Sequence, residues 1–212
     1  MMLIKDKYRP VFSLRVPYGN GGVKNLSIST DLLGDFYRGT ESKIDLFVQS
    51  HALNRFQERL DVLGPSAINF EFWMNTCAIT EFVFYKNYLL LPVTVQEIRV
   101  GYFLTHLVGD ELVFRTFLFI THSCTPEGDK LKEITGLEKN DIKYWHIDRL
   151  STIIEADKYP KIQELFNEAG IGELLGFRDD FCDPESMPNI NMDGLMSYIE
   201  RGKEMVGEAE LN

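Results

Sequence analysis

The chain has 212 residues, of which 44% are hydrophobic and 12% aromatic, so it can bury a sizeable core and is expected to form a single domain. These proportions exclude a collagen-like or low-complexity protein and disorder over most of the chain. The formal net charge is −10, with 11 basic and 22 acidic residues in 107–212 against 11 and 10 in 1–106. Broad nonspecific binding of nucleic acid is therefore disfavoured, while the first half leaves room for a local basic groove.

The cysteines and the chain start indicate a reducing compartment. Cys77, Cys124 and Cys182 are odd in number, and their spacing matches no zinc or redox motif, so free thiols are expected. Charged residues follow Met1 too closely for a signal peptide, and no segment approaches the roughly 20 apolar residues of a membrane span. We expect a cytoplasmic protein with no metal site, no cofactor and no membrane contact.

Short strands and two helices are expected in the first 80 residues. Glycine and asparagine in residues 19–22 favour a tight turn and hence a hairpin, and Gly64-Pro65 separates two helical patterns. The expected elements are strands over 9–18 and 23–30, a short helix from residue 30 or 31 to about 34, a strand over 44–49, and helices over 51–63 and 66–77.

A change to two-residue periodicity between residues 81 and 122 predicts the centre of a sheet. The expected strands are 82–85, 88–95, 98–108 and 111–121. Gly109-Asp110 has the composition of a two-residue turn, which pairs Val108 with Glu111 and His106 with Val113. The same register places Glu97 opposite His122 at the far end of the hairpin.

Helices are expected again in the second half. They cover 126–135, 141–157, 160–170 and 193–206, with an acidic loop over 177–192 and a frayed tail over 207–212. His146 falls on the apolar face of the second of these helices and is expected in the core. The sequence thus predicts an α+β domain with a central antiparallel sheet over 1–125, an early amphipathic helix and a helical, acidic portion over 126–206.

The helix over 51–63 has the clearest pattern of any segment. One face carries Leu53, Phe56, Leu60 and Leu63. Because residues advance by about 100° along a helix, the opposite face carries His51, Arg55 and Glu58, with Arg59 at its border. Arginine binds phosphate oxygens and histidine moves protons near neutral pH, so this stripe suits phosphate chemistry. The alternative is a solvated face on which Arg55 pairs with Glu58.

Residues 50–59, Ser-His-Ala-Leu-Asn-Arg-Phe-Gln-Glu-Arg, resemble the opening helix of RelE-like and BrnT-like ribonuclease toxins and of related uncharacterised bacterial proteins. That helix often reads His-Ala-x-x-Arg-x-x-Glu-Arg and precedes an antiparallel sheet. The resemblance covers about ten residues and implies a fold more strongly than a reaction. The length of this chain and its acidic charge depart from the short, basic toxins.

The predicted hairpin adds two further clusters of polar residues. On one face, His106 lies diagonally beside Arg115, and at the other end Arg99 and Glu97 accompany His122. Metal-independent RNA cleavage needs a base, an acid and a positive charge on the phosphate, which either cluster could supply together with the His51 stripe. The alternatives are a solvent-exposed His106 and a His122 that hydrogen-bonds its own loop.

Two functions follow from these patterns. In the first, the chain is a binding or accessory protein without catalysis, and the polar face of helix 51–63, with Arg59, Arg99 and Arg115, recognises a protein partner. In the second, the chain is a RelE-like endoribonuclease that uses His51, Arg55 and Glu58 with His106 or His122, and only this function requires RNA. The sequence favours the first, because the motif is short and the chain is acidic.

Overall fold

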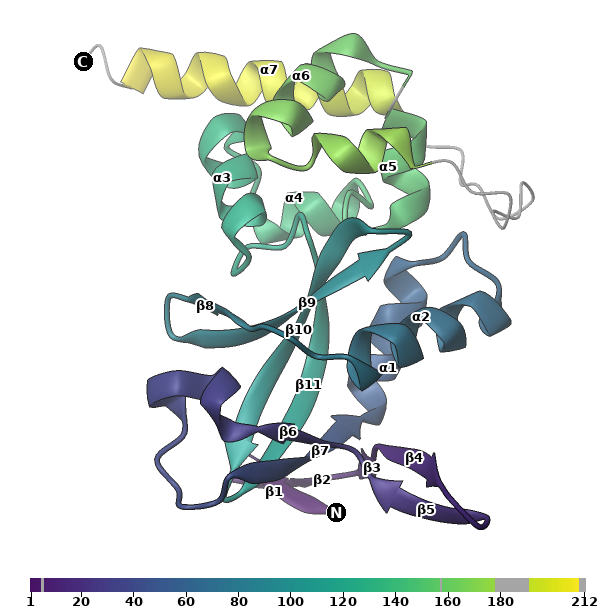
Figure 1. The fold of residues 1–212 in the computed structure, drawn as a ribbon. Helices are drawn as coiled ribbons and strands as arrows, with labels where there is room; N and C mark the ends of the chain where they lie inside the picture. Colours follow the sequence, from purple (N-terminus) through teal and green to yellow (C-terminus); the bar gives the residue numbers. More distant parts are fainter. Residues whose placement is uncertain (5, 157, 178–190, 210–212) are drawn as a thin grey trace.

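The computed structural model describes residues 1–4, 6–156, 158–177 and 191–209. It contains a twisted sheet with two helices beside it and a group of helices at one end, which confirms the predicted α+β class (Figure 1). The strands are β1 (Met2–Ile4), β2 (Lys7–Arg9), β3 (Val11–Ser13), β4 (Arg15–Tyr18), β5 (Gly22–Asn25), β6 (Ser27–Ser29), β7 (Lys43–Gln49), β8 (Val83–Tyr85), β9 (Tyr88–Val95), β10 (Ile98–Val108) and β11 (Glu111–Phe119). The helices are α1 (Ser50–Arg59), α2 (Pro65–Cys77), α3 (Pro126–Thr135), α4 (Lys139–Tyr144), α5 (Leu150–Ala156), α6 (Pro160–Ala169) and α7 (Met192–Ala209), with short 3-10 helices η1 (Thr30–Phe36) and η2 (Gly172–Gly176).

The main sheet is antiparallel except for one ladder. Within the described residues it has seven strands in the order β3-β7-β11-β10-β9-β8, and β6 also pairs with β7. β7 runs parallel to β11, because the chain leaves β7 through α1 and α2 and returns along the β8–β11 meander. The parallel ladder brings α1, which begins where β7 ends, alongside the second half of β11.

The predicted N-terminal hairpin is divided between two sheets. Its turn forms as expected, with Asn20 and Gly21 in the left-handed region between β4 and β5. The outer parts, β3 and β6, pair with β7 instead of with each other. β7 is a core strand, because its alternate residues Ile44, Leu46 and Val48 are almost fully buried. Both β3 and β6 therefore pair with β7.

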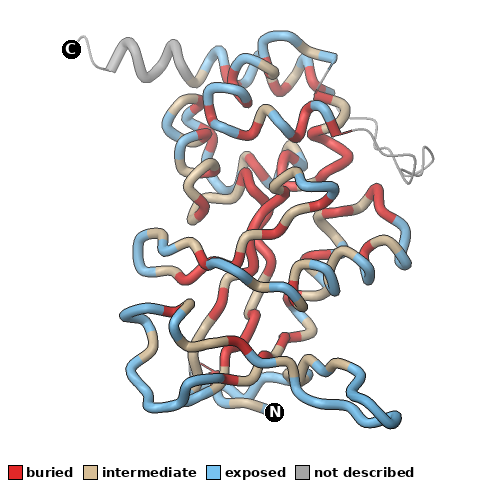
Figure 2. The backbone as a smooth tube through the Cα atoms, in the orientation of Figure 1, coloured by how far each residue is buried: buried red, intermediate tan, exposed pale blue. Residues whose placement is uncertain are grey.

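Phenylalanine rings join α1 and α2 to the sheet. The Phe56 ring of α1 lies 5.1 Å from Phe117 and 5.4 Å from Phe103 between ring centroids, and Phe72 of α2 lies 5.7 Å from Phe103. Figure 2 shows the buried backbone running through the sheet and into the helical end. Burying one such ring is worth roughly 3 kcal/mol. This contact decides which face of α1 is left for polar residues.

The helical end departs from the prediction at one place. A single helix was expected over 141–157, but α4 ends at Tyr144 and α5 begins at Leu150. His146 lies in the left-handed region between them and is exposed, so its predicted core position is wrong. α7 reaches Ala209 instead of ending near Val206, and residues 178–190 of the predicted acidic loop and 210–212 of the predicted tail lie outside the described residues.

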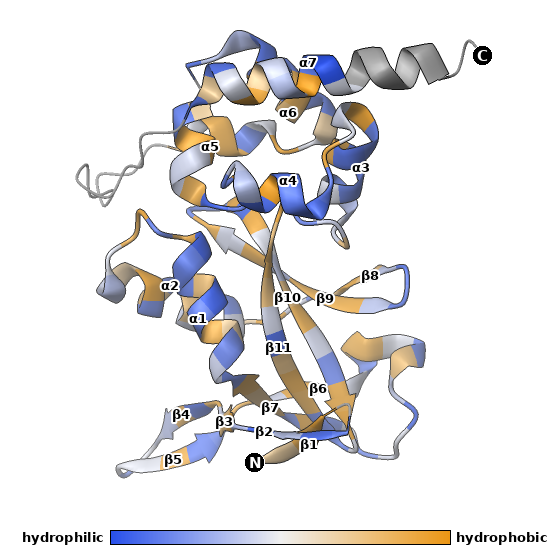
Figure 3. Cartoon of the chain, turned by 180° about the vertical axis from the view of Figure 1, so that it is seen from behind, coloured by the Kyte–Doolittle hydropathy of each residue, from blue (hydrophilic) through white to orange (hydrophobic). Residues whose placement is uncertain are grey.

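Hydropathy follows burial along the chain (Figure 3). The long strands β9, β10 and β11 are largely hydrophobic, whereas α1 and α4 contain many hydrophilic residues. In the part of the chain that the structure describes, no helix has both the length and the apolar character needed to span a bilayer.

Candidate functional site

Helix α1 follows β7 directly, so the end of the sheet fixes the position of its first turn. Phe56 of the predicted apolar face is buried against the sheet, but Leu53 of that face is only partly buried, and Ala52, which was not predicted there, is fully buried. The helix ends at Arg59, four residues before the predicted end at residue 63. Leu60, Val62 and Leu63 are all buried, and one helical face cannot bury residues 60, 62 and 63 together. A turn therefore replaces the last predicted helical residues.

A cavity of about 470 Å³ lies between α1, β11 and α4. Its lining residues are His51, Arg55 and Arg59 of α1, Thr116–Phe119 of β11, His122 and Ser123 of the following turn, Lys139, Asn140, Ile142 and Lys143 of α4, and Asp148. The structure thus brings the polar stripe of α1 together with His122. We refer to this cavity as the α1 cleft.

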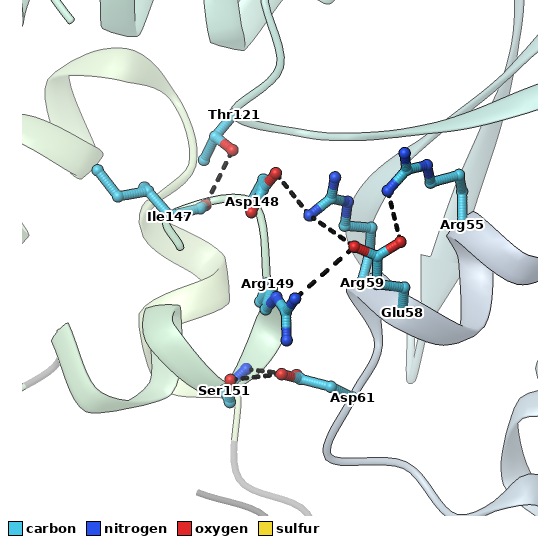
Figure 4. Close-up of polar contacts among 9 residues, drawn as sticks. All are labelled: Arg55, Glu58, Arg59, Asp61, Thr121, Ile147, Asp148, Arg149 and Ser151. Atoms are coloured by element: carbon cyan, nitrogen blue, oxygen red, sulfur yellow. Dashed lines mark hydrogen bonds and ion pairs between the residues drawn. The ribbon is translucent and has the colours of Figure 1, made fainter. Parts of the chain in front are cut away.

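The ionisable side chains of α1 and their partners at the α1 cleft form two groups of three, and Lys139 and Lys143 of α4 belong to neither. The outer group consists of His51, Arg55 and Glu58, where Arg55 Nη1 donates to Glu58 Oε2 at 2.5 Å and both side chains are 36% exposed (Figure 4). This is the intrahelical pair that the sequence offered as an alternative to a functional stripe. It leaves both side chains in contact with solvent.

The inner group consists of Arg59, His122 and Asp148. Arg59 Nη1 lies 2.5 Å from Asp148 Oδ2, and their side chains are only 13% and 6% exposed (Figure 4). Glu58 links the two groups, because its Oε1 lies 3.7 Å from Arg59 and also 3.7 Å from Arg149. Arg59, predicted as a residue that binds a partner, is therefore held in a buried ion pair of the chain itself.

Burial and neighbouring charges set the protonation of this cleft. Burial, with Arg55 and Arg9 nearby, lowers the pKa of His51, and burial is also the main cause of the lowered pKa of His122. Both imidazoles are therefore neutral at pH 7. Burial would raise the pKa of Glu58, but the guanidinium groups of Arg59 and Arg55 outweigh it and keep that pKa below its usual value.

The pKa of the inner carboxylate, Asp148, is raised, whereas that of Glu58 is lowered. Burial raises the pKa of Asp148, and Arg59 and Arg149 oppose this rise. Because the Arg59 ion pair is short and nearly dry, it has the character of a structural pair, which is costly to break from one side.

His122 is fixed by the turn that follows β11. Its Nδ1 contacts the Ser123 carbonyl, which favours the tautomer with the proton on Nδ1 and leaves Nε2 as an acceptor. Thr125 caps α3 and also donates to the His122 carbonyl at 2.8 Å. A Cβ at Gly128 would overlap that carbonyl, so the first turn of α3 packs directly on the backbone of His122. The expected contact between His122 and its own loop is therefore present.

Sequence reasoning missed Asp148, because it lies in the break between α4 and α5. The break is held by hydrogen bonds to distant residues: Thr121 donates to the Ile147 carbonyl at 2.9 Å, and Asp61 accepts from the backbone and hydroxyl of Ser151 (Figure 4). No proline or glycine marks residues 145–149. The local sequence therefore carries no signal for this carboxylate.

The predicted pair of His106 and Arg115 meets at a different cavity. His106 pairs with Val113 as predicted, and it lines a cavity of about 350 Å³ together with Arg115. Arg115 also lines a cavity of about 310 Å³ with Arg9 and His51. This smaller cavity adjoins the α1 cleft, since His51 and Thr116 line both.

The predicted cluster of His122 with Arg99 and Glu97 does not form. A register shift between Leu104 and Thr105 and the turn at Glu97 end the predicted pairing, so His122 lies beyond β11. Arg99 and Glu97 line a separate cavity of about 530 Å³ near η2. There Arg99 lies 3.4 Å from the Tyr102 hydroxyl, which donates to Glu127 at 2.8 Å. Burial is the main reason that the pKa of Tyr102 rises to about 12.

Comparison of the chain with protein-family models, with curated proteins and with solved structures finds no match. The resemblance of residues 50–59 to ribonuclease toxins therefore stays a prediction. Among the described residues, no group of three or more histidine, cysteine, aspartate or glutamate side chains is arranged to hold a metal ion.

Proposed function

We propose that the protein is a binding protein whose α1 cleft receives an anionic group, best matched by a phosphate carried on a protein partner. The observation that carries this proposal is the convergence of Arg55, Lys139 and Lys143 on one cavity of a chain whose formal net charge is −10. The lining also contains Asp148, but its charge is paired with Arg59, so the cleft keeps a net positive charge, which attracts ligands of the opposite sign.

The lysines of α4 supply most of the available charge. Lys139 and Lys143 are exposed at the cleft and form no ion pair with a carboxylate of the described residues. Arg55 has Glu58 as its partner, but a half-exposed pair contributes only about 0–1 kcal/mol, so a phosphate can replace that carboxylate at little cost. A phosphate would then receive hydrogen bonds from an arginine fork and from lysine ammonium groups.

A charge reversal on α4 tests this proposal. Lys143→Glu is compared with Lys130→Glu, an exposed lysine of α3 outside the cleft, on arrays of peptides that carry either phosphoserine or serine. We expect the unaltered protein and Lys130→Glu to retain phosphorylated peptides preferentially, and Lys143→Glu to lose about tenfold in retention, because one charge-assisted hydrogen bond is worth roughly 1.5–3 kcal/mol. Equal retention of both peptide sets by the unaltered protein would contradict the proposal.

Metal-independent RNA cleavage is the second candidate, because His51 and His122 line the same cavity. A neutral His51 would take the proton of a ribose 2′-hydroxyl, whose oxygen then attacks phosphorus. The bond to the 5′-oxygen breaks, and a protonated His122 returns a proton to it, which leaves a 2′,3′-cyclic phosphate and a 5′-hydroxyl. The free protein has the base for this step, but both pKa values are lowered, so it lacks the protonated acid at pH 7. Binding therefore ranks above cleavage.

The cleavage candidate is tested with RNA, both free and bound to ribosomes. If it holds, Arg55→Ala abolishes cleavage while the melting temperature is nearly unchanged, and His122→Gln removes the alkaline limb of the pH profile, because a general acid is lost as it deprotonates. If the unaltered protein cuts neither form of RNA, this function is excluded and the binding function is unaffected.

A further inference from the structure

Strand β11 loses one of its neighbours half-way along its length. Its parallel ladder with β7 ends where Phe114 pairs with Val48, since the chain turns from Gln49 into α1. The antiparallel ladder with β10 continues on the other edge as far as Phe119. Among the residues that the structure describes, no strand pairs with the second edge of β11 from Thr116 onward.

The hydrogen-bond pattern shows which backbone groups face this open edge. Ile120 N–H donates to the Val100 carbonyl at 3.0 Å, within the register that also pairs Phe119 with Gly101. Residues of an antiparallel strand alternate between bonding one neighbour and turning to the other side. Phe117 and Phe119 therefore direct their N–H groups away from β10. The Phe119 carbonyl accepts from His122 N–H at 2.8 Å, so the Phe117 carbonyl is the acceptor left for another strand.

This open edge lies in the α1 cleft. Thr116–Phe119 form one wall of the cavity of about 470 Å³, and Arg55 and Lys143 lie on the walls beside it. In Figure 3, α4 lies above and β1–β2 below the same stretch of β11, with α1 to one side. An unpaired strand edge is a template for an added strand, and proteins normally cover or interrupt it. Here the edge is combined with a positive charge suited to one kind of ligand.

We infer that the partner binds as an extended peptide segment, which adds to β11 as a short strand beyond the end of β7 and places a phosphorylated side chain at Arg55 and Lys143. Main-chain hydrogen bonds give such added strands their affinity, and neighbouring pockets select alternate side chains. The phosphorylated side chain rests on the proposed function, whereas the strand addition rests on the backbone of Thr116–Phe119 alone.

The test uses the tightest-binding phosphopeptide from the array described above, resynthesised in two forms. Each form carries N-methyl groups on alternate amides, one form on the odd and the other on the even positions. Because only every second amide of an added strand faces β11, we expect one form to bind at least about tenfold more weakly and the other to bind within about twofold of the parent. Hydrogen exchange should show the amides of Phe117 and Phe119 protected by the parent peptide.

The outcomes separate this inference from the proposed function. Equal weakening by both N-methylated forms, or protection confined to α4, overturns strand addition even if phosphate is still preferred. A preference for one N-methylated form without any preference for phosphate supports strand addition and contradicts the phosphate-binding function. Retention of RNA oligonucleotides with no retention of any peptide overturns the inference.

Discussion

The inner and outer groups of the α1 cleft contain the same three kinds of side chain in different surroundings. Each has an arginine, a carboxylate and a histidine, but the outer ion pair is 36% exposed on both sides, while the inner side chains of Arg59 and Asp148 are 13% and 6% exposed. In the proposed function the outer pair exchanges its partner for a ligand, whereas the inner pair joins α1 to the segment between α4 and α5. Burial, more than residue type, separates the solvent-exposed pair from the structural one.

The largest expected effect is on the inner group. Asp148→Ala leaves the Arg59 guanidinium buried without its partner, so we expect the free energy of unfolding to fall by about 3 kcal/mol. The matching change in the outer group, Glu58→Ala, should cost no more than about 1 kcal/mol, because a half-exposed pair contributes little. Urea denaturation of both variants measures the difference. Equal losses would remove the distinction between the two groups.

A second prediction concerns the attachment of α5 to the turn after α1. Asp61 accepts hydrogen bonds from the Ser151 backbone at 3.0 Å and from its hydroxyl at 2.7 Å. Asp61→Ala should lower the free energy of unfolding by about 1–2 kcal/mol, as for the loss of a helix N-cap. Asp61→Asn retains one acceptor oxygen and should recover about half of this loss. Denaturation midpoints that match those of the unaltered protein would show that this contact is dispensable.

The third prediction is a difference in pH dependence between the two histidines. The pKa of His122 is lowered by burial, so the folded state binds fewer protons than the unfolded chain. Its contribution to stability is complete above the unfolded pKa of about 6.5 and is lost as the pH falls through the folded pKa. His122→Gln should flatten the decline in stability below that pH, and His51→Gln, an exposed position, should flatten it less. A larger effect at His51 would reverse the assignment of inner and outer groups.

The smallest expected effect on stability is that of Arg55. Arg55→Ala removes a half-exposed pair, so the free energy of unfolding should change by less than about 1 kcal/mol, while retention of phosphorylated peptides is lost. Thermal denaturation and the peptide array measure the two properties on the same sample. A marked drop in the melting temperature would mean that Arg55, like Arg59, has a structural role.

Local periodicity was sufficient to predict the outer group. His51, Arg55 and Glu58 follow helical spacing on the side opposite Leu53 and Phe56, so a single amphipathic helix specifies them. The inner group is different, since it joins residues 59, 122 and 148 from three separate elements. Asp148 enters it only because hydrogen bonds from Thr121 and Ser151 hold the break between α4 and α5.

In the hairpin of β10 and β11, too, the sequence predicts local pairing correctly but not the more distant pairing. Its register is correctly predicted near the Gly109-Asp110 turn, where His106 pairs with Val113, because turn length fixes the nearest pairs. The shift at Leu104 and Thr105 moves every later pair by one residue, and the predicted meeting of Glu97 with His122 is lost. The parallel pairing of β7 with β11 depends on contacts between residues more than 60 positions apart, which short-range patterns do not encode.

The most direct test of the central claim is a titration of the protein with inorganic phosphate, followed by the backbone amide resonances in ¹⁵N NMR spectra. The α1 cleft as an anion site predicts saturable shifts for residues of α1, for Thr116–Phe119 and for Lys139–Lys143, and the loss of these shifts in Lys143→Glu. Shifts that are absent from these segments, or that gather instead around Arg99 and η2, would contradict it.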